Sequence, residues 1–150
     1  MRRAIYPGSF DPFHEGHLNI LVKATKLFDE VIVVITKNIS KNENPDLKYR
    51  IEKIKSMTKG LKNVKIEINE SELTAYFAKQ RKIKYMVRGI RDSQTLNYEI
   101  ELYDGNKSIY DELETVLFLS DNKNRKVSST LLKEIEKYKS EEFICDQLKK

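Results

Sequence analysis

Cysteine is rare in this chain of 150 residues, tryptophan is absent, and long hydrophobic runs are missing. The single Cys145 can form neither an internal disulfide nor a cysteine metal cluster, which is typical of proteins from a reducing compartment. No apolar run approaches the roughly 20 residues that span a bilayer, and residues 1–3 lead straight into a short apolar run rather than a signal-peptide core. We therefore expect a cytoplasmic protein without a membrane partner.

Proline and glycine are also scarce, with 3 and 5 residues, which excludes collagen-like and low-complexity classes. The chain is 39% hydrophobic and 34% charged, and its length suits one domain with its own core, so we expect residues 1–150 to form a single domain. The net charge of +5 comes from lysines interleaved with glutamates, without a basic stripe that carries stacking aromatics. We therefore expect no nucleic-acid partner, although a positive field would attract nucleotides.

Five short apolar segments alternate with stretches of helical periodicity. The second is apolar throughout, as in a strand buried on both faces, whereas the third alternates with polar residues and indicates a strand near the edge of a sheet. Successive strand–helix–strand units predict an α/β dinucleotide-binding (Rossmann-like) fold with a five-stranded parallel sheet in the order 3-2-1-4-5. The expected strands are Ala4–Tyr6, Val31–Ile35, Val64–Ile68, Ile83–Val87 and Glu114–Leu119.

The segments between and after these strands predict five helices, and the fourth is expected over residues 92–109. Its apolar spacing places Leu96, Ile100 and Tyr103 on one face. The expected helix starts lie near Gly16, Asp46, Ala75, Asp92 and Ser128.

The segment Ala4–His17 has the pattern of a strand, a tight turn and a helix start. Pro7 is expected to end the strand because it lacks a ladder donor, and Gly8 to let the backbone adopt unusual conformations close to a ligand. Gly16 and His17 fall in the first turn of the helix, where free N–H groups and the positive end of the dipole favour an anion. This junction is therefore a candidate phosphate site.

His14 and His17 are three residues apart, so both imidazoles can lie on one helical face and donate to phosphate oxygens. The alternative is that His14 is a solvated turn residue and His17 a helix-capping one. The glycines and the strand-to-helix context favour the phosphate interpretation.

Arg88 and Arg91 flank Gly89 after the fourth strand, a fork arrangement that suits bidentate phosphate contacts. The alternative is that the two guanidinium groups pair with acidic neighbours such as Asp92 or Glu99. Because carboxyl ends of parallel strands bind ligands, we favour a phosphate role.

Three other segments should reach the same sheet edge: the loop with Lys41, the Leu73–Thr74 turn, and residues 124–130. In the last of these, the hydroxyls of Ser128–Thr130 could either cap a helix or bind phosphate with its free N–H groups. The sequence shows no nucleophile with a partnered base and no glycine-rich lysine loop, so it indicates direct phosphoryl or nucleotidyl transfer by positioning and charge stabilisation.

Four of these segments resemble one known family. His14–His17 resembles the His-x-Gly-His signature of the nucleotidylyltransferase superfamily, and Tyr6–Pro12 resembles its phosphopantetheine adenylyltransferase branch, which usually carries Thr at the position of His14. Arg88–Arg91, followed by Tyr98–Glu99, and Val127–Thr130 resemble two further segments of that branch.

The resemblance implies adenylyl transfer from ATP to 4′-phosphopantetheine, with Mg²⁺ bridging nucleotide oxygens rather than held by a protein metal site, and a hexameric homo-oligomer. It implies catalytic roles for His17, Lys41 and Arg91. The implied phosphopantetheine-binding residues are Ser9, Lys41, Leu73, Thr74 and Arg88. The implied ATP-binding residues are Ser9, Phe10, His17, Gly89, Ile90, Arg91, Glu99, Asn124, Arg125, Lys126, Val127, Ser128, Ser129 and Thr130.

Two alternatives share these features. One is adenylyl or cytidylyl transfer to another phosphate, such as nicotinamide mononucleotide or glycerol 3-phosphate. The other is a nucleotide- or nucleic-acid-binding domain without turnover, which would show steeply salt-dependent binding to duplex DNA.

Overall fold

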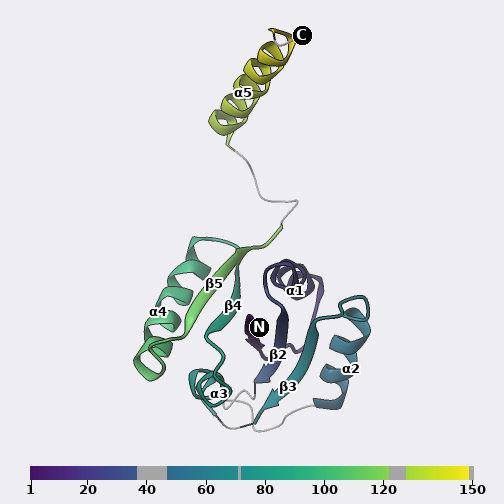
Figure 1. Ribbon diagram of the computed structural model, residues 1–150, viewed down its shortest axis with the longest axis vertical. Coiled ribbons are helices and arrows are strands. Elements are labelled where there is room, and N and C mark those ends of the chain that lie inside the picture. The colour runs from purple at the N-terminus through teal and green to yellow at the C-terminus, as the bar shows by residue number, and fades with distance from the viewer. Residues whose placement is uncertain (37–46, 71, 122–127, 149–150) are drawn as a thin grey trace.

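The computed structural model describes residues 1–36, 47–70, 72–121 and 128–148. Five parallel strands form one sheet in the order β3-β2-β1-β4-β5, which confirms the predicted α/β fold and strand order (Figure 1). The strands are β1 (Arg3–Gly8), β2 (Glu30–Thr36), β3 (Val64–Asn69), β4 (Tyr85–Ile90) and β5 (Glu114–Leu119). The helices are α1 (Glu15–Leu27), α2 (Leu47–Met57), α3 (Thr74–Gln80), α4 (Ser93–Ile109) and α5 (Ser129–Leu148).

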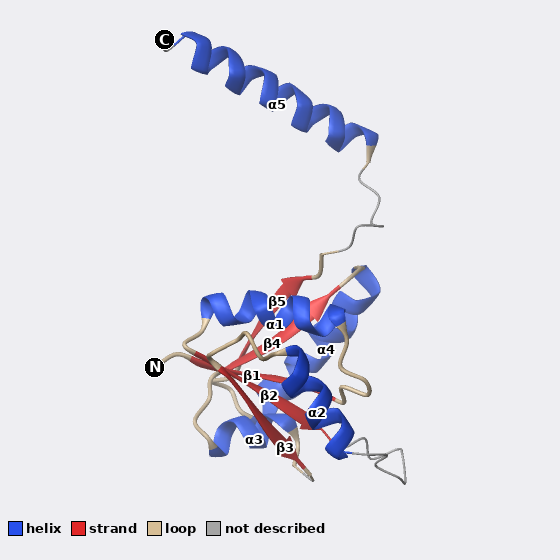
Figure 2. Cartoon of the chain, turned by 90° about the vertical axis from the view of Figure 1, so that its right-hand side faces the viewer, coloured by secondary structure: helices blue, strands red, loops and turns tan. Residues whose placement is uncertain are grey.

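Helices cover both faces of the sheet and bury two apolar clusters. The cluster on one face joins α1 and α2 to alternate residues of β1 and β2, and the other cluster joins α3 and α4 to the intervening residues (Figure 2). The apolar run of β2 from Val31 to Ile35 is buried throughout, as its sequence predicted. The edge strand β3 is half-exposed, which agrees with its alternating pattern.

β1 and β4 both continue beyond their predicted ends. Pro7 and Gly8 still pair with Val34 and Ile35 of β2, so the prediction that Pro7 ends the strand is wrong. β1 pairs with β4 only at Ala4 and Ile5. Beyond Ile5, β1 pairs with β2 but not with β4. A strand that is paired on one side only tolerates proline, which has no N–H group to donate. The strand order reverses between β1 and β4, and the early end of their pairing opens a crevice at that switch point.

The predicted apolar face of α4 is buried only in part, because Leu96 and Tyr103 are half-buried. Glu99 and Asn106 are buried and Leu102 packs against the apolar cluster, whereas Ile100 is 49% exposed. A charged residue takes the inward position because its ion-pair partner, Arg88, lies on β4. Sequence periodicity, which assigns charged residues to solvent, could not show this.

The last helix, α5, stands apart from the sheet in both views (Figures 1 and 2). Residues 128–140 are exposed, including the apolar side chains of Leu131, Leu132 and Ile135. Within the described residues, no helix is long and apolar enough to cross a membrane.

Candidate active site

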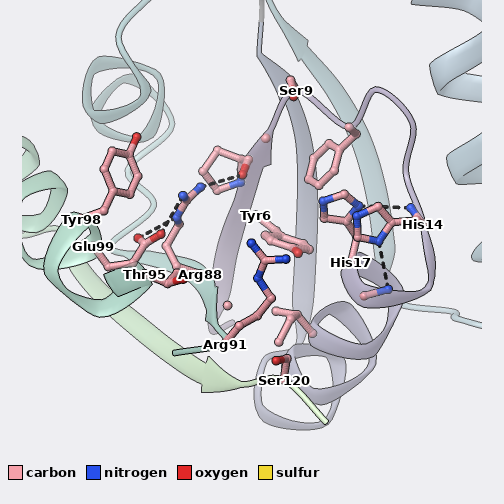
Figure 3. A pocket seen from close by; sticks show the side chains of 16 residues that line it. Tyr6, Ser9, His14, His17, Arg88, Arg91, Thr95, Tyr98, Glu99 and Ser120 are labelled. Carbon is pink, nitrogen blue, oxygen red and sulfur yellow. Dashed lines mark hydrogen bonds and ion pairs between the residues drawn. The ribbon is translucent and has the colours of Figure 1, made fainter. Parts of the chain in front are cut away.

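A cavity of about 440 Å³ lies at the carboxyl ends of β1 and β4, in the crevice opened by their diverging strands (Figure 3). The β1–α1 junction forms one wall, and the end of β4 with the first turns of α4 forms the other. The lining residues are Tyr6, Pro7, Gly8, Ser9, Phe10, His14, Gly16, His17, Ile20, Arg88, Gly89, Arg91, Thr95, Tyr98, Glu99 and Ser120.

The turn after β1 is built around the buried ring of Phe10. Phe10 has a φ of 48°, a left-handed conformation that costs a non-glycine residue on the order of 1–3 kcal/mol and persists where packing holds it. Its ring makes edge contacts with Tyr6, Phe13 and His17 at centroid distances of 5.1–5.4 Å. A Cβ on Gly8 would lie 2.8 Å from Cζ of this ring. Gly8 is therefore needed for close packing and not, as predicted, for an unusual backbone conformation.

The two histidines form a reciprocal cap at the start of α1. The backbone N–H of His14 donates to Nδ1 of His17, and the backbone N–H of Gly16 donates to Nδ1 of His14, each at 3.1 Å. The rings stack with centroids 3.8 Å apart. An acceptor Nδ1 places the proton of a neutral His17 on Nε2, so this ring keeps one N–H donor for another partner.

Burial of the His17 ring, then the nearby charges of His14 and Arg91, lower its pKa from 6.5 to about 4. His17 is therefore neutral near pH 7 and lines the cavity as a hydrogen-bond donor. The capping interpretation and the phosphate interpretation thus use different nitrogen atoms of the same ring, and the structure accommodates both.

Arg88 forms a bidentate ion pair with Glu99, the alternative that the sequence left open for this arginine. Nε and Nη2 each donate to a carboxylate oxygen at 2.8 Å, and Nη1 donates to the carbonyl of Pro7 at 3.2 Å. Burial alone would lower the pKa of Arg88, but its hydrogen bonds and charge attraction to Glu99 raise it above the ordinary value. These three hydrogen bonds use three of the five N–H groups of Arg88. The other two can donate to a ligand at the cavity wall.

Gly89 lies within β4, opposite Phe118 of β5, and not in a turn. A Cβ there would lie 2.7 Å from Cγ1 of Ile20, so the glycine lets α1 approach the sheet closely. Arg91 follows the strand, and its guanidinium points toward Tyr6 in the cavity (Figure 3).

A smaller hollow of about 170 Å³ adjoins the cavity. It shares Pro7, Gly8, Arg88 and Tyr98 with the larger one. Its further lining residues are all uncharged: Thr36, Thr74, Met86, Leu102 and Asn106. The two spaces together therefore offer a cationic part and an extension in which Arg88 is accompanied by uncharged side chains.

The structure brings several predicted site residues together around the two spaces: Ser9, Phe10, His17, Thr74, Arg88, Gly89, Arg91 and Glu99. Ile90 and Leu73 do not line them, and Leu73 is 58% exposed just before α3. Lys41 and residues 124–127 lie outside the described residues.

Ser128, Ser129 and Thr130 are exposed at the start of α5 and do not line the cavity. Oγ of Ser128 accepts a hydrogen bond from the N–H of Leu131 at 3.1 Å, which is the capping alternative. The end of β5 lies beside the cavity, because Asp121 is bound to Asn19 and Lys23 of α1 and Ser120 lines the wall.

Sequence reasoning missed Tyr6, Thr95, Tyr98 and Ser120 as lining residues. Ser120 could have been found, since it directly follows β5 at the ligand-binding edge. Tyr6 has the pattern of a core residue, and only 5% of it is exposed. Among the described residues, no group of three His, Cys, Asp or Glu side chains could hold a metal ion.

A parallel sheet with a cationic cavity at its switch point is typical of nucleotide-binding α/β folds, and a family model described as cytidylyltransferase-like matches residues 5–135. Phosphopantetheine adenylyltransferase of Mycoplasma mycoides subsp. mycoides SC is 51% identical over 93% of this chain and 99% of its own. The enzyme of that name from Buchnera aphidicola subsp. Acyrthosiphon pisum is 41% identical over 93% and 85%. The chain therefore belongs to the phosphopantetheine adenylyltransferase family, within this cytidylyltransferase-like group.

Two solved structures share the fold at lower identity. Nicotinic acid mononucleotide adenylyltransferase of Plasmodium falciparum, complexed with NaAD, is 21% identical with a TM-score of 0.61, over 88% of this chain and 70% of its own. A lipopolysaccharide core biosynthesis protein of Thermoplasma volcanium is 23% identical with a TM-score of 0.59, over 81% and 99%. These likenesses concern the fold alone.

Proposed function

We propose that the chain transfers the adenylyl group of ATP to 4′-phosphopantetheine and releases dephospho-coenzyme A and pyrophosphate. The observation that carries this proposal is the cationic cavity at the β1–β4 switch point, with an uncharged N–H donor, His17, facing two arginines, in a chain of this family. The adjoining hollow, lined by Arg88 and by uncharged side chains, would take the pantetheine arm of the acceptor.

In this reaction a phosphate oxygen of the acceptor attacks the α-phosphorus of ATP. The new oxygen–phosphorus bond forms as the bond to the bridging oxygen breaks, and that oxygen leaves on pyrophosphate. His17 cannot serve as a base, because Nδ1 already accepts from His14 and Nε2 carries the proton. Direct attack needs no base, since the acceptor phosphate is ionised. The Nε2–H group instead donates to oxygens that gain charge in the transition state.

The two substrates would use different parts of the site. Arg88, held by Glu99, would bind the acceptor phosphate, with Thr74 in the hollow beside the pantetheine arm. Phe10, His17 and Arg91 would surround the phosphates of ATP. The remaining assignments, to Lys41 and residues 124–130, rest on the family resemblance.

Mg²⁺ fits this site as a companion of ATP. Glu99 is the carboxylate among the described lining residues, and both of its oxygens accept from Arg88. Hard Mg²⁺ keeps waters and substrate phosphates as ligands, so ATP itself would hold the ion, which would neutralise charge on the phosphates.

We also propose a homo-oligomer, a hexamer by family resemblance. Exposed apolar side chains on α4 and β5, namely Ile100, Leu117 and Leu119, support burial of this edge in an assembly. Molar mass from light scattering after gel filtration tests it, and a monomer at micromolar concentration would contradict it.

The activity is tested by pyrophosphate release from MgATP with a panel of acceptors: phosphopantetheine, nicotinamide mononucleotide and nicotinate mononucleotide, with glycerol 3-phosphate tested with CTP as well. We expect phosphopantetheine to have the highest kcat/KM. A preference of tenfold or more for another acceptor, about 1.4 kcal/mol of transition-state discrimination, would overturn the acceptor while leaving nucleotidyl transfer standing.

A further inference from the structure

The buried side chain of Arg50 connects α2 to the turn after β1. Only 4% of this residue is exposed, although arginine is rarely buried unless it is paired or hydrogen-bonded. Its Nη1 donates to the carbonyl oxygen of Ser9 at 2.8 Å, across 41 residues of sequence. Arg50 does not line the cavity, whereas Ser9 does, so the guanidinium contacts the turn from behind.

This hydrogen bond fixes the orientation of the peptide group between Ser9 and Phe10. In a trans peptide the carbonyl and the N–H point in opposite directions. With the carbonyl of Ser9 held by Arg50, the N–H of Phe10 is directed away from Arg50. If this peptide group were flipped, the carbonyl oxygen of Ser9 would lie on the side away from Arg50, where it would repel an anion.

The turn has a specific need for such an anchor. Phe10 carries the left-handed φ of 48°, and a residue in this region persists only where its surroundings hold it. The aromatic contacts of the Phe10 ring hold this residue in place, and Arg50 holds the peptide group between Ser9 and Phe10.

We propose that Arg50 is a positioning residue for the nucleotide: it holds the Ser9–Phe10 peptide with its N–H free to donate to a phosphate of ATP. This inference rests on the proposed function for the identity of the anion. A guanidinium suits the role because it stays charged when buried and its N–H groups point in fixed directions.

The test uses two substitutions and a matched control. Arg50→Met removes the donor but keeps an unbranched apolar side chain, and Arg50→Lys keeps a charged donor without the planar fork. Lys55→Met removes a positive charge from an exposed position of the same helix. Calorimetric titration measures ATP and phosphopantetheine binding separately, and thermal unfolding monitors the fold.

We expect Arg50→Met to weaken ATP binding about tenfold or more relative to Lys55→Met, while phosphopantetheine binding changes by less than about twofold. Arg50→Lys should restore part of the loss and remain about threefold weaker than the control. An ATP affinity within twofold of the control, or equal losses for both substrates, overturns the inference. If Arg50→Met does not fold, Arg50→Lys decides by the same comparison.

The outcomes separate this inference from the proposed function. A wild-type chain that binds ATP but does not adenylylate phosphopantetheine contradicts the proposed function and leaves the Arg50 comparison valid. An active chain whose Arg50 variants bind ATP like the control contradicts the role of Arg50 alone.

Discussion

The backbone N–H of His14 donates to Nδ1 of His17 at 3.1 Å, and this contact determines which ring nitrogen of His17 carries the proton. The same contact is part of the cap at the first turn of α1. The start of the helix therefore fixes the orientation of the His17 ring, and with it the N–H donor that would face the substrate. The consequences for rate and for pH dependence can be measured separately.

The rate consequence concerns His17→Ala. We expect kcat to fall by about 10²–10³, since the lost N–H donor acts on charge that develops in the transition state, while the KM for ATP changes little. Steady-state kinetics with MgATP and phosphopantetheine measures both.

His14→Ala is the matched control for the capping role of the pair. It removes the side-chain acceptor for the N–H of Gly16 and leaves the backbone donor to His17 in place. It should lower the free energy of unfolding by about 1 kcal/mol and affect kcat by less than tenfold. If His17→Ala kept a kcat near that of the wild type, His17 would have no role in the mechanism.

The pH consequence follows from the lowered pKa of His17, about 4 against 6.5 in the unfolded chain. Below pH 6.5 the unfolded state binds a proton that the folded state does not, so stability should fall as the pH drops from 6.5 toward 4. Urea unfolding of the wild type and His17→Gln at pH 7, 6 and 5 measures this, and the wild type should lose more.

The same pKa predicts that His17 contributes no inflection to the pH profile of kcat near pH 6.5. His17 stays neutral down to about pH 5, so its donor is unchanged over that range. A loss of activity with a midpoint near 6.5 in the wild type that is absent from His17→Gln would show that the ring is not buried as described.

The strand order could be predicted because five short strand-like segments, one of them apolar throughout, alternate with helical stretches along the chain. The position of His17 in the first turn of α1 was also predictable, because Gly16 and the following apolar period indicate the helix start. Both predictions use the pattern of residues along the sequence and need no knowledge of contacts between distant segments.

The ends of β1 and β4 and the inward face of α4 depend instead on contacts between distant segments. Pro7 remains in a strand because β4 has diverged at that point, and Gly89 remains in one because Ile20 of α1 needs the space. Glu99 turns inward because Arg88, eleven residues earlier, meets it there. Propensity and periodicity contain no information on these partners.

The Arg88–Glu99 pair predicts an effect on both stability and the acceptor. Glu99→Ala should lower the free energy of unfolding by about 3 kcal/mol, because it leaves a largely buried guanidinium without its counter-charge. It should also lower kcat/KM for phosphopantetheine about tenfold, since Arg88 loses the two bonds that orient it. Denaturant unfolding and steady-state kinetics are the measurements.

Glu101→Ala, at an exposed position of the same helix, is the control for this pair and should change neither quantity appreciably. Equal stability of the Glu99 and Glu101 variants would mean that the buried ion pair contributes nothing to folding.

Two glycines give opposite predictions, because only Gly89 lies where α1 packs closely on β4. Gly89→Ala should destabilise the protein by about 1–3 kcal/mol, because the new methyl group would lie 2.7 Å from Cγ1 of Ile20. Gly105→Ala, within α4 and with no contact from another part of the described chain within 4 Å of the new Cβ, should stabilise it by about 0.5–1 kcal/mol. Urea unfolding of the two variants measures both signs.

A double-mutant cycle with Ile20→Ala identifies the cause. Removing Cγ1 and Cδ1 of Ile20 takes away the atoms closest to the methyl group that Gly89→Ala introduces, so this substitution should cost less in the Ile20→Ala background than in the wild type. A coupling of about 0.5–3 kcal/mol in that direction is expected for residues in direct contact. If the two substitutions were additive, the cost at Gly89 would come from the backbone of β4 rather than from the packing of α1 on the sheet.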